Sequence, residues 1–154
     1  MSSGGEFFVA KEQVQNLEAA SKYKIMMSRA TAEHAGEPDK DGKFKVISRS
    51  EILPPEVVCT DSYIILGVSD NKAETENCFT YLKTRFLRFL VLQSLSSINL
   101  TKEKFQFVPL QDFTPQSDID WGGSVESVDI QLYDKYGLTA EERAFIEATI
   151  RPMA

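Results

Sequence analysis

The stretch Ser62-Tyr-Ile-Ile-Leu-Gly-Val68, followed by Tyr81-Leu-Lys-Thr-Arg-Phe-Leu-Arg-Phe-Leu90, decides the expected fold of this chain. The first stretch is a continuous apolar run, which is typical of a strand inside a sheet. The second repeats its apolar residues at helical spacing, and Asp70 is a suitable N-cap, so we expect one helix from there to about Ser94. Such a helix exceeds the usual length of roughly 10 to 14 residues and is expected to support the core.

The angular positions of the residues on this helix indicate which side faces the core. At about 100° per residue, Leu82, Phe86 and Phe89 fall within one narrow arc. Arg85 falls inside the same apolar arc, which predicts a buried ion pair, because an unpaired charge is costly to bury. Lys83, by contrast, lies outside the arc.

The second half of this helix is apolar nearly all round. Leu87 and Val91 occupy the nominally exposed side, while Arg88 lies on a shoulder of the apolar arc. A helix with apolar residues on every side must be covered by another part of the protein. We therefore expect the C-terminal residues to pack against it.

The C-terminal residues predict two short helices in a hairpin. Ser124 is a suitable N-cap for the first, and Gly137 suits the left-handed residue that ends it. Thr139-Ala-Glu-Glu142 is a capping box that begins the second helix. We expect Trp121 to attach this hairpin to the core.

The rest of the chain supplies further strands. Residues 23–28, 43–48 and 57–60 have strand-like patterns, and residues 6–21 indicate a short helix. The sequence therefore predicts an α+β fold, with a mixed sheet of about four to six strands packed on one long central helix and a C-terminal helical hairpin.

We expect a single domain over residues 1–154. Its parts are a variable strand and loop region (1–56), a strand–helix core (57–113) and the helical hairpin (114–154). The composition, 42% hydrophobic and 26% charged, is that of an ordinary soluble domain. The sequence shows neither an apolar run of about 18 residues nor a signal peptide, so we expect a cytoplasmic protein without a membrane segment.

The charge is unevenly distributed. The net charge is -6, which at first disfavours nucleic-acid binding, because contacts with phosphates need lysine and arginine. However, residues 22–49 hold seven basic and four acidic side chains, and residues 83–104 hold five and one. Residues 111–154 hold three and nine. A basic part of the surface can therefore face DNA while the acidic C-terminal part faces away.

Two segments superficially resemble metal sites. Asp39 and Asp41 precede Lys43 as in metal-dependent nucleases, but all three lie in one tight turn, so an exposed turn is the preferred interpretation. Asp118 to Asp129 partly matches a calcium-binding loop, yet its fifth position is Gly122 and no helix leads into it. We prefer a helix-capping turn there.

The chain shows no pattern of nucleophilic catalysis. His34 is the only histidine and lies in a loop, so no Ser-His-Asp or Cys-His set can be built without it. Cys59 and Cys78 lack metal-ligand spacing, which favours buried reduced thiols. We expect no catalytic residue, no metal site and no cofactor in this chain.

Seven segments occur in an order and spacing that together resemble a known family. They are Cys59-Thr-Asp-Ser-Tyr-Ile-Ile-Leu-Gly67, Glu76-Asn77, Tyr81 to Leu90 as quoted above, Phe107-Val-Pro-Leu-Gln-Asp-Phe113, Ser117-Asp-Ile-Asp-Trp121, Gln131-Leu-Tyr-Asp-Lys-Tyr-Gly-Leu138 and Phe145-Ile-Glu147. With these segments, residues 57–153 resemble the C-terminal target-recognition domain of adenine-N6 DNA methyltransferases of restriction-modification systems, particularly the bifunctional type II enzymes that combine methylase and restriction endonuclease.

The resemblance implies a DNA-recognition role without catalysis. The family's Asn/Asp-Pro-Pro-Tyr/Phe motif is absent, since Pro54-Pro55 follows Ile52-Leu53 and precedes Glu56. S-adenosylmethionine is accordingly expected only in a catalytic methyltransferase domain, in the same chain or a partner chain. The expected ligand is double-stranded DNA, held through basic side chains: Arg29, His34, Lys40, Lys43, Lys45 and Arg49, and secondarily Lys83, Arg88, Lys102 and Lys104.

A second hypothesis belongs to a different class. The acidic C-terminal part and the largely apolar central helix also fit a protein-interaction or scaffolding module of a larger bacterial enzyme. Binding to a DNA duplex that weakens steeply with salt distinguishes the first hypothesis from the second.

Overall fold

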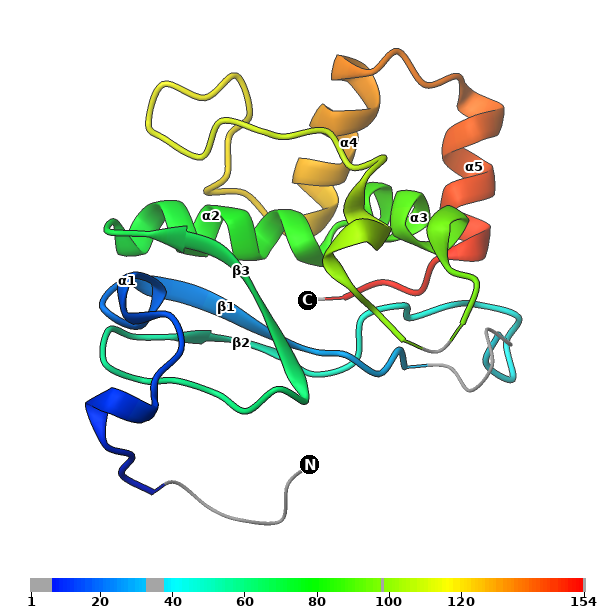
Figure 1. The fold of residues 1–154 in the computed structure, drawn as a ribbon. Helices are drawn as coiled ribbons and strands as arrows, with labels where there is room; N and C mark the ends of the chain where they lie inside the picture. The colour runs from blue at the N-terminus through cyan, green and yellow to red at the C-terminus, as the bar shows by residue number, and fades with distance from the viewer. Residues whose placement is uncertain (1–6, 33–37, 98, 154) are drawn as a thin grey trace.

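A small antiparallel sheet and a set of helices build the structure, a computed structural model that describes residues 7–32, 38–97 and 99–153. The strands are β1 (Tyr23–Ser28), β2 (Ser50–Leu53) and β3 (Tyr63–Ser69), in the order β2-β1-β3. Helices cover one face of this sheet (Figure 1). The α+β class predicted from the sequence is confirmed.

The core lies between the sheet and the helices. On β1, Ile25 pairs with Ile52 of β2 and Leu66 of β3, and Met27 pairs with Ile64 of β3. All five side chains belong to or pack against the hydrophobic core, because alternate residues of a strand point to the same face. Ile25 and Met27 are completely buried, as expected for the central strand of the sheet.

The sheet is smaller than predicted, and it is antiparallel instead of mixed. In the described part of the chain it has three strands, not four to six. Residues 57–60, which follow Pro54-Pro55, form no strand, and neither do residues 43–48. In the second segment the reason is Val46, whose φ of 69° is incompatible with an extended strand. Phe44 and Ile47 instead form isolated bridges with Ile150 and Thr31.

The predicted helix of residues 6–21 is reduced to two short pieces over its described part. They are η1 (Lys11–Gln13) and α1 (Leu17–Ala20), the latter capped by the side chain of Asn16. Phe7, Phe8 and Leu17 remain exposed, and Ala20 is the buried residue of α1. Without an apolar face packed on a core, a longer helix gains little stability.

The predicted single central helix is broken at Thr84. The two parts are α2 (Lys72–Lys83), which is capped by Asn71 and not by Asp70, and α3 (Arg85–Ser94). Thr84 has an extended conformation, with ψ of 147°. Its hydroxyl donates to the carbonyl of Tyr81 at 2.7 Å and accepts from the amide of Leu87 at 3.2 Å. One side chain therefore ends the first helix and begins the second.

A buried carboxylate from the C-terminal region completes this break. Asp129 is 2% exposed, and its two oxygens accept from the amides of Arg85 and Phe86, both at 2.9 Å. Burial raises the pKa of Asp129, and the two amide hydrogen bonds oppose that shift. A negative charge is favourable at a helix N-terminus, where amide groups lack partners inside the helix.

The C-terminal helical hairpin was predicted correctly. It consists of α4 (Val125–Lys135) and α5 (Ala140–Thr149) and follows the short helix η3 (Lys102–Phe105) along the chain. Ser124 caps α4, Thr139 and Glu142 form the capping box of α5, and Gly137 has a φ of 64°.

The hairpin packs on α3 as expected, because α3 contacts both α4 and α5. Aromatic rings of the hairpin meet Phe86, which stacks on Tyr136 at 5.0 Å, and Phe89, while Leu87 and Val91 are buried at 1% and 0% exposure. Trp121 is 7% exposed and contacts Tyr81 and Phe113 through ring centroids 5.9 Å and 5.2 Å apart. No described helix has the length and apolar character needed to cross a bilayer.

The Asp129 carboxylate makes a stability prediction. Substitution Asp129→Ala leaves two buried amide donors at the start of α3 without their acceptor, so we expect the free energy of unfolding to fall by about 2–4 kcal/mol. Asp134→Ala on the same helix is the matched control. It removes only an exposed ion pair with Arg143 and should cost less than about 1 kcal/mol. Urea unfolding measures both, and equal losses would contradict the assigned role of Asp129.

Candidate nucleic-acid interface

Three basic segments meet at the C-terminal end of β1. The amide of Ser28 donates to the carbonyl of Arg49 at 2.8 Å, and the carbonyl of Arg29 accepts from the amide of Leu100 at 2.6 Å. Isolated bridges join the same segments. Residues 28–32, 47–50 and 99–100 therefore lie side by side (Figure 1), with Lys102 shortly beyond.

The two arginines of this cluster are exposed. Arg49 pairs with Glu51 at 2.9 Å, and its guanidinium lies 5.9 Å from the centre of the Tyr63 ring. Exposed ion pairs of this kind contribute little free energy, so a phosphate can displace Glu51 at small cost. Arg29 is exposed on the neighbouring segment.

The lysines of η3 add to this cluster. Lys102 is exposed, and Lys104 is half-buried, with its ammonium donating to the hydroxyl of Ser96 at 3.0 Å. Glu103 lies between them in sequence, and a hydrogen bond from the Thr101 side chain contributes most to lowering its pKa. We define the basic cluster as Arg29, Arg49, Lys102 and Lys104.

The loop before this cluster carries three further lysines in different settings. Lys40 is exposed beside Asp39, whose carboxylate accepts from the amides of Asp41 and Lys43. The Asp39 carboxylate is therefore bound by amides of its own turn. This arrangement agrees with the turn that was preferred over a nuclease site. Lys43 donates to the carbonyl of Glu147 at 3.1 Å, so its ammonium lies at the end of α5.

The base of this loop is a strained turn. The amide of Ile47 donates to the carbonyl of Lys45 at 2.9 Å across Val46, an arrangement that is a γ-turn with a positive φ. Lys45 itself is half-buried, and its carbonyl also accepts from the guanidinium of Arg88 at 3.1 Å. The turn separates Phe44, which pairs with Ile150 just after α5, from Ile47, which pairs with Thr31 just after β1.

Arg88 is not available to contact DNA, and its assignment as a DNA-binding residue is wrong. Its side chain is 0% exposed, and its Nε donates to the carbonyls of Lys83 and Thr84 at the helix break. The Lys83 side chain is half-buried, with its ammonium 4.6 Å from the centre of the Phe79 ring. His34 lies outside the described residues.

The predicted buried ion pair of Arg85 is also wrong. Arg85 is half-buried, and it makes no ion pair within 4.0 Å in the part of the chain that the structure describes. The break at Thr84 changes the phase of the helix, so that Arg88 turns into the core. The angular count assumed one unbroken helix. It therefore placed Arg85 inside the apolar arc and Arg88 outside it, whereas Arg88 is the fully buried one.

The carboxylates of the calcium-like segment do not converge. Asp118 pairs with Lys135 at 2.8 Å, Asp120 accepts from the amide of Gly122, and Asp129 caps α3. Residues 125–129 are already helical. The preferred interpretation, a turn that leads into a capped helix, agrees with this geometry.

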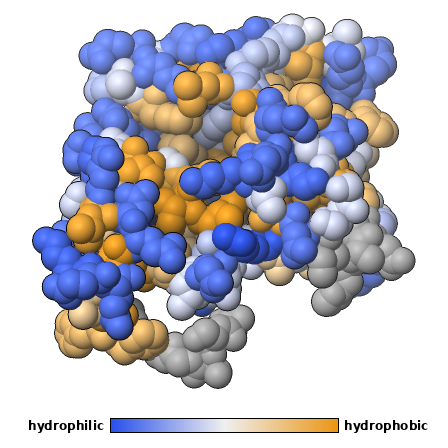
Figure 2. All heavy atoms as spheres, in the orientation of Figure 1, coloured by the Kyte–Doolittle hydropathy of each residue, from blue (hydrophilic) through white to orange (hydrophobic). Residues whose placement is uncertain are grey.

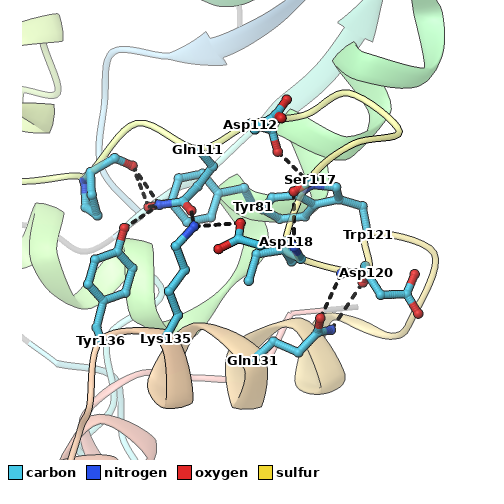
Figure 3. A network of polar contacts seen from close by, with 12 residues as sticks. Tyr81, Gln111, Asp112, Ser117, Asp118, Asp120, Trp121, Gln131, Lys135 and Tyr136 are labelled. Atoms are coloured by element: carbon cyan, nitrogen blue, oxygen red, sulfur yellow. Dashed lines mark hydrogen bonds and ion pairs between the residues drawn. The ribbon is translucent and has the colours of Figure 1, made fainter.

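A polar network that the sequence did not indicate fixes the segment before α4 (Figure 3). Gln111 donates to the hydroxyl of Tyr136 at 2.8 Å and accepts from the ammonium of Lys135 at 3.0 Å. The indole of Trp121 donates to the carbonyl of Asp112 at 2.9 Å. Burial raises the pKa of the Tyr81 phenol, which donates to the carbonyl of Pro109 at 2.9 Å.

An open hollow of about 470 Å³ lies beside this network. Asn77, Trp121, Gln131 and parts of residues 114–122 line it. Gln131 accepts from the amide of Asp120 and donates to its carbonyl, and Asn77 donates to the carbonyl of Phe113. The side chains of Gln131 and Asn77 therefore bind the main chain of the loop, and their role is structural.

An apolar groove lies between α3 and α5. Its volume is about 500 Å³, and six of the eight residues that line it are apolar, the other two being Glu141 and Glu142. Phe145 is 62% exposed, and its ring meets that of Phe89 edge to face at 5.8 Å. A different apolar area, near the middle of Figure 2, lies over the sheet and α2 and is separate from this groove. The sequence feature that indicates this groove is the excess of apolar residues on α3. The C-terminal hairpin covers these residues only in part.

Comparisons with protein-family models, with curated proteins and with solved structures find no match for this chain.

The burial of the two cysteines predicts low reactivity of their thiols. Burial raises the pKa of Cys78 from 9.0 to about 12, and it also raises the pKa of Cys59. The thiolate fraction of Cys78 near pH 8 is then about 1,000-fold lower, while the greater nucleophilicity of a more basic thiolate recovers about 30-fold. We expect Cys78 to be alkylated by iodoacetamide about 30-fold more slowly in the native protein than in urea. Equal rates, measured by mass spectrometry, would overturn this account.

Proposed function

We propose that this chain is the DNA-recognition part of a restriction-modification adenine-N6 DNA methyltransferase, including the bifunctional type II form. It binds double-stranded DNA and does not itself methylate or cleave. The observation that carries the proposal is the convergence of the basic cluster, Arg29, Arg49, Lys102 and Lys104, on one end of the sheet. The segments that carry the family resemblance support it.

The rigidity of the cluster also supports this function. Main-chain hydrogen bonds at 2.6 and 2.8 Å join the segments that carry Arg29 and Arg49 to each other and to Leu100, so the backbone under these side chains is fixed. Contacts to phosphates from a fixed frame place neighbouring side chains at defined positions along a groove, where bases are read. The loop that carries Lys40 projects from the same frame.

The acidic residues lie elsewhere. Glu126 and Asp134 are exposed on α4, and Glu141, Glu142 and Glu147 are exposed on α5. In Figure 1 these two helices extend away from the sheet on the side opposite to the turn between β2 and β3. These five carboxylates belong to other elements than the basic cluster, and the end of α5 that carries Glu147 bonds to the neighbouring loop through Lys43.

The remaining parts of the proposal concern the complete enzyme. A methyltransferase catalytic domain, in the same or a partner chain, binds S-adenosylmethionine and carries out the methyl transfer. The protein works in the cytoplasm, where its DNA is. The second candidate function, a protein-interaction or scaffolding module, is favoured by the apolar groove between α3 and α5.

Salt-dependent DNA binding tests the proposal. The chain is titrated against a fluorescent random-sequence duplex, and the logarithm of the association constant is plotted against that of the salt concentration. The slope falls by about 0.9 for each phosphate contact that is lost. We expect Arg29→Ala, Arg49→Ala and Lys102→Ala each to reduce the slope by about 0.9 and to weaken binding at low salt several-fold.

Lys72→Ala is the matched control. Lys72 is an exposed lysine that pairs with Glu76, and it begins α2 at the other end of the sheet, where Ser69 pairs with Tyr23. Its removal should leave the slope unchanged. Absence of duplex binding even at low salt, or a slope that Lys72→Ala alters as much as Arg29→Ala does, would reject the proposed interface.

A further inference from the structure

The groove between α3 and α5 has the character of a protein-binding surface. Its walls are the side chains of Phe86, Phe89, Leu90, Leu138, Phe145 and Ile146. Phe145 leaves more than half of its surface in solvent, and Phe89 and Leu90 are only half-buried. Large apolar side chains that remain accessible beside one another are characteristic of sites that a partner covers.

The mouth of the groove is negatively charged. Glu141 and Glu142 lie on its rim and are exposed. Glu142 accepts from the amide of Thr139 in the capping box, which leaves its charge in place. The nearest cation in sequence, Arg143, is directed toward α4, where it pairs with Asp134 at 2.8 Å.

This charge distribution selects among occupants. A DNA phosphate is repelled by the two glutamates, so the groove does not extend the basic cluster. A second copy of this chain, packed groove to groove, brings Glu141 and Glu142 against their own equivalents, which is unfavourable. The apolar residues Phe7 and Phe8 are largely exposed, but the N-terminal segment lies at the opposite end of the molecule from α5 (Figure 1).

The main chain of the walls indicates the form of the occupant. Apart from Leu138, the walls are α-helical, and their main-chain groups bond within each helix or to capping side chains such as Asp129 and Thr139, so an extended peptide finds no strand edge to pair with. An amphipathic helix satisfies its own main chain and inserts apolar side chains spaced three or four residues apart.

We propose that the α3–α5 groove binds a basic amphipathic helix of a partner protein, with apolar side chains against Phe89 and Phe145 and lysine or arginine against Glu141 and Glu142. This site is separate from the basic cluster. The inference therefore goes beyond the proposed DNA binding and does not depend on it.

A designed peptide tests the proposal with the full chain. The probe is a fluorescent helix of about 18 residues, made of leucine and lysine with all leucines on one face. Its controls are a scrambled peptide of the same composition and a leucine–glutamate helix of the same pattern. We expect the probe to bind with a dissociation constant in the range of tens of micromolar and both controls to bind at least about tenfold more weakly.

Matched variants locate the site. Phe145→Ser should weaken binding of the probe about tenfold, whereas Phe107→Ser, which alters an equally exposed phenylalanine elsewhere (60% against 62%), should not. Glu141→Gln should weaken binding about threefold and reduce its salt dependence, whereas Glu126→Gln on α4 should do neither. Each of these side chains is exposed, so the variants keep the fold.

Several outcomes would overturn the inference. If the scrambled peptide binds equally well, the partner need not be an amphipathic helix. If the leucine–glutamate helix binds equally well, the partner need not be basic. Equal losses in Phe145→Ser and Phe107→Ser remove the site. Sedimentation that shows a dimer of the wild-type chain, dissociated by Phe145→Ser, assigns the groove to a second copy. DNA binding is measured in separate titrations, so its failure leaves each of these results readable.

Discussion

The break between α2 and α3 is the constraint on which the rest of the structure depends. Three side chains from different places hold it: Thr84 at the break, Asp129 from α4, and Arg88 from within α3. Asp129 attaches the C-terminal hairpin to the start of α3, and Arg88 attaches the carbonyl of Lys45 to the same place. A buried carboxylate and a buried guanidinium thus connect the acidic hairpin and the basic loop to one turn of the helix.

The sequence predicted those elements that are determined by neighbouring residues. Strands β1 and β3, the capping box at Thr139, the cap at Ser124 and the left-handed Gly137 were all found, because each rests on a pattern within a few residues. The helix break was missed for the opposite reason. Threonine is a weak helix former that does not by itself end a helix, and Asp129, which stabilises the break, lies more than forty residues away in the chain.

The candidate site shows the same division. Exposed lysines and arginines were identified from their abundance in two segments, but their convergence depends on pairing between residues 28–32, 47–50 and 99–100, which no local pattern encodes. The different environments of Arg85 and Arg88 follow from the missed break, because a change of helical phase turns Arg88 into the core and leaves Arg85 half-buried. One long-range contact therefore accounts for errors in both the fold and the site.

The strained γ-turn at Val46 is joined to the same helix break through Arg88. A β-branched residue at positive φ costs on the order of 1–3 kcal/mol and persists only where the surroundings impose it. Here Val46 is completely buried, and the carbonyl before it accepts from both Ile47 and Arg88. The turn directs the chain from the end of α5 to the end of β1, so the core sets the angle at which the lysine-bearing loop leaves the molecule. Rigidity at the base of a loop suits recognition, because it lowers the conformational entropy lost when the loop binds.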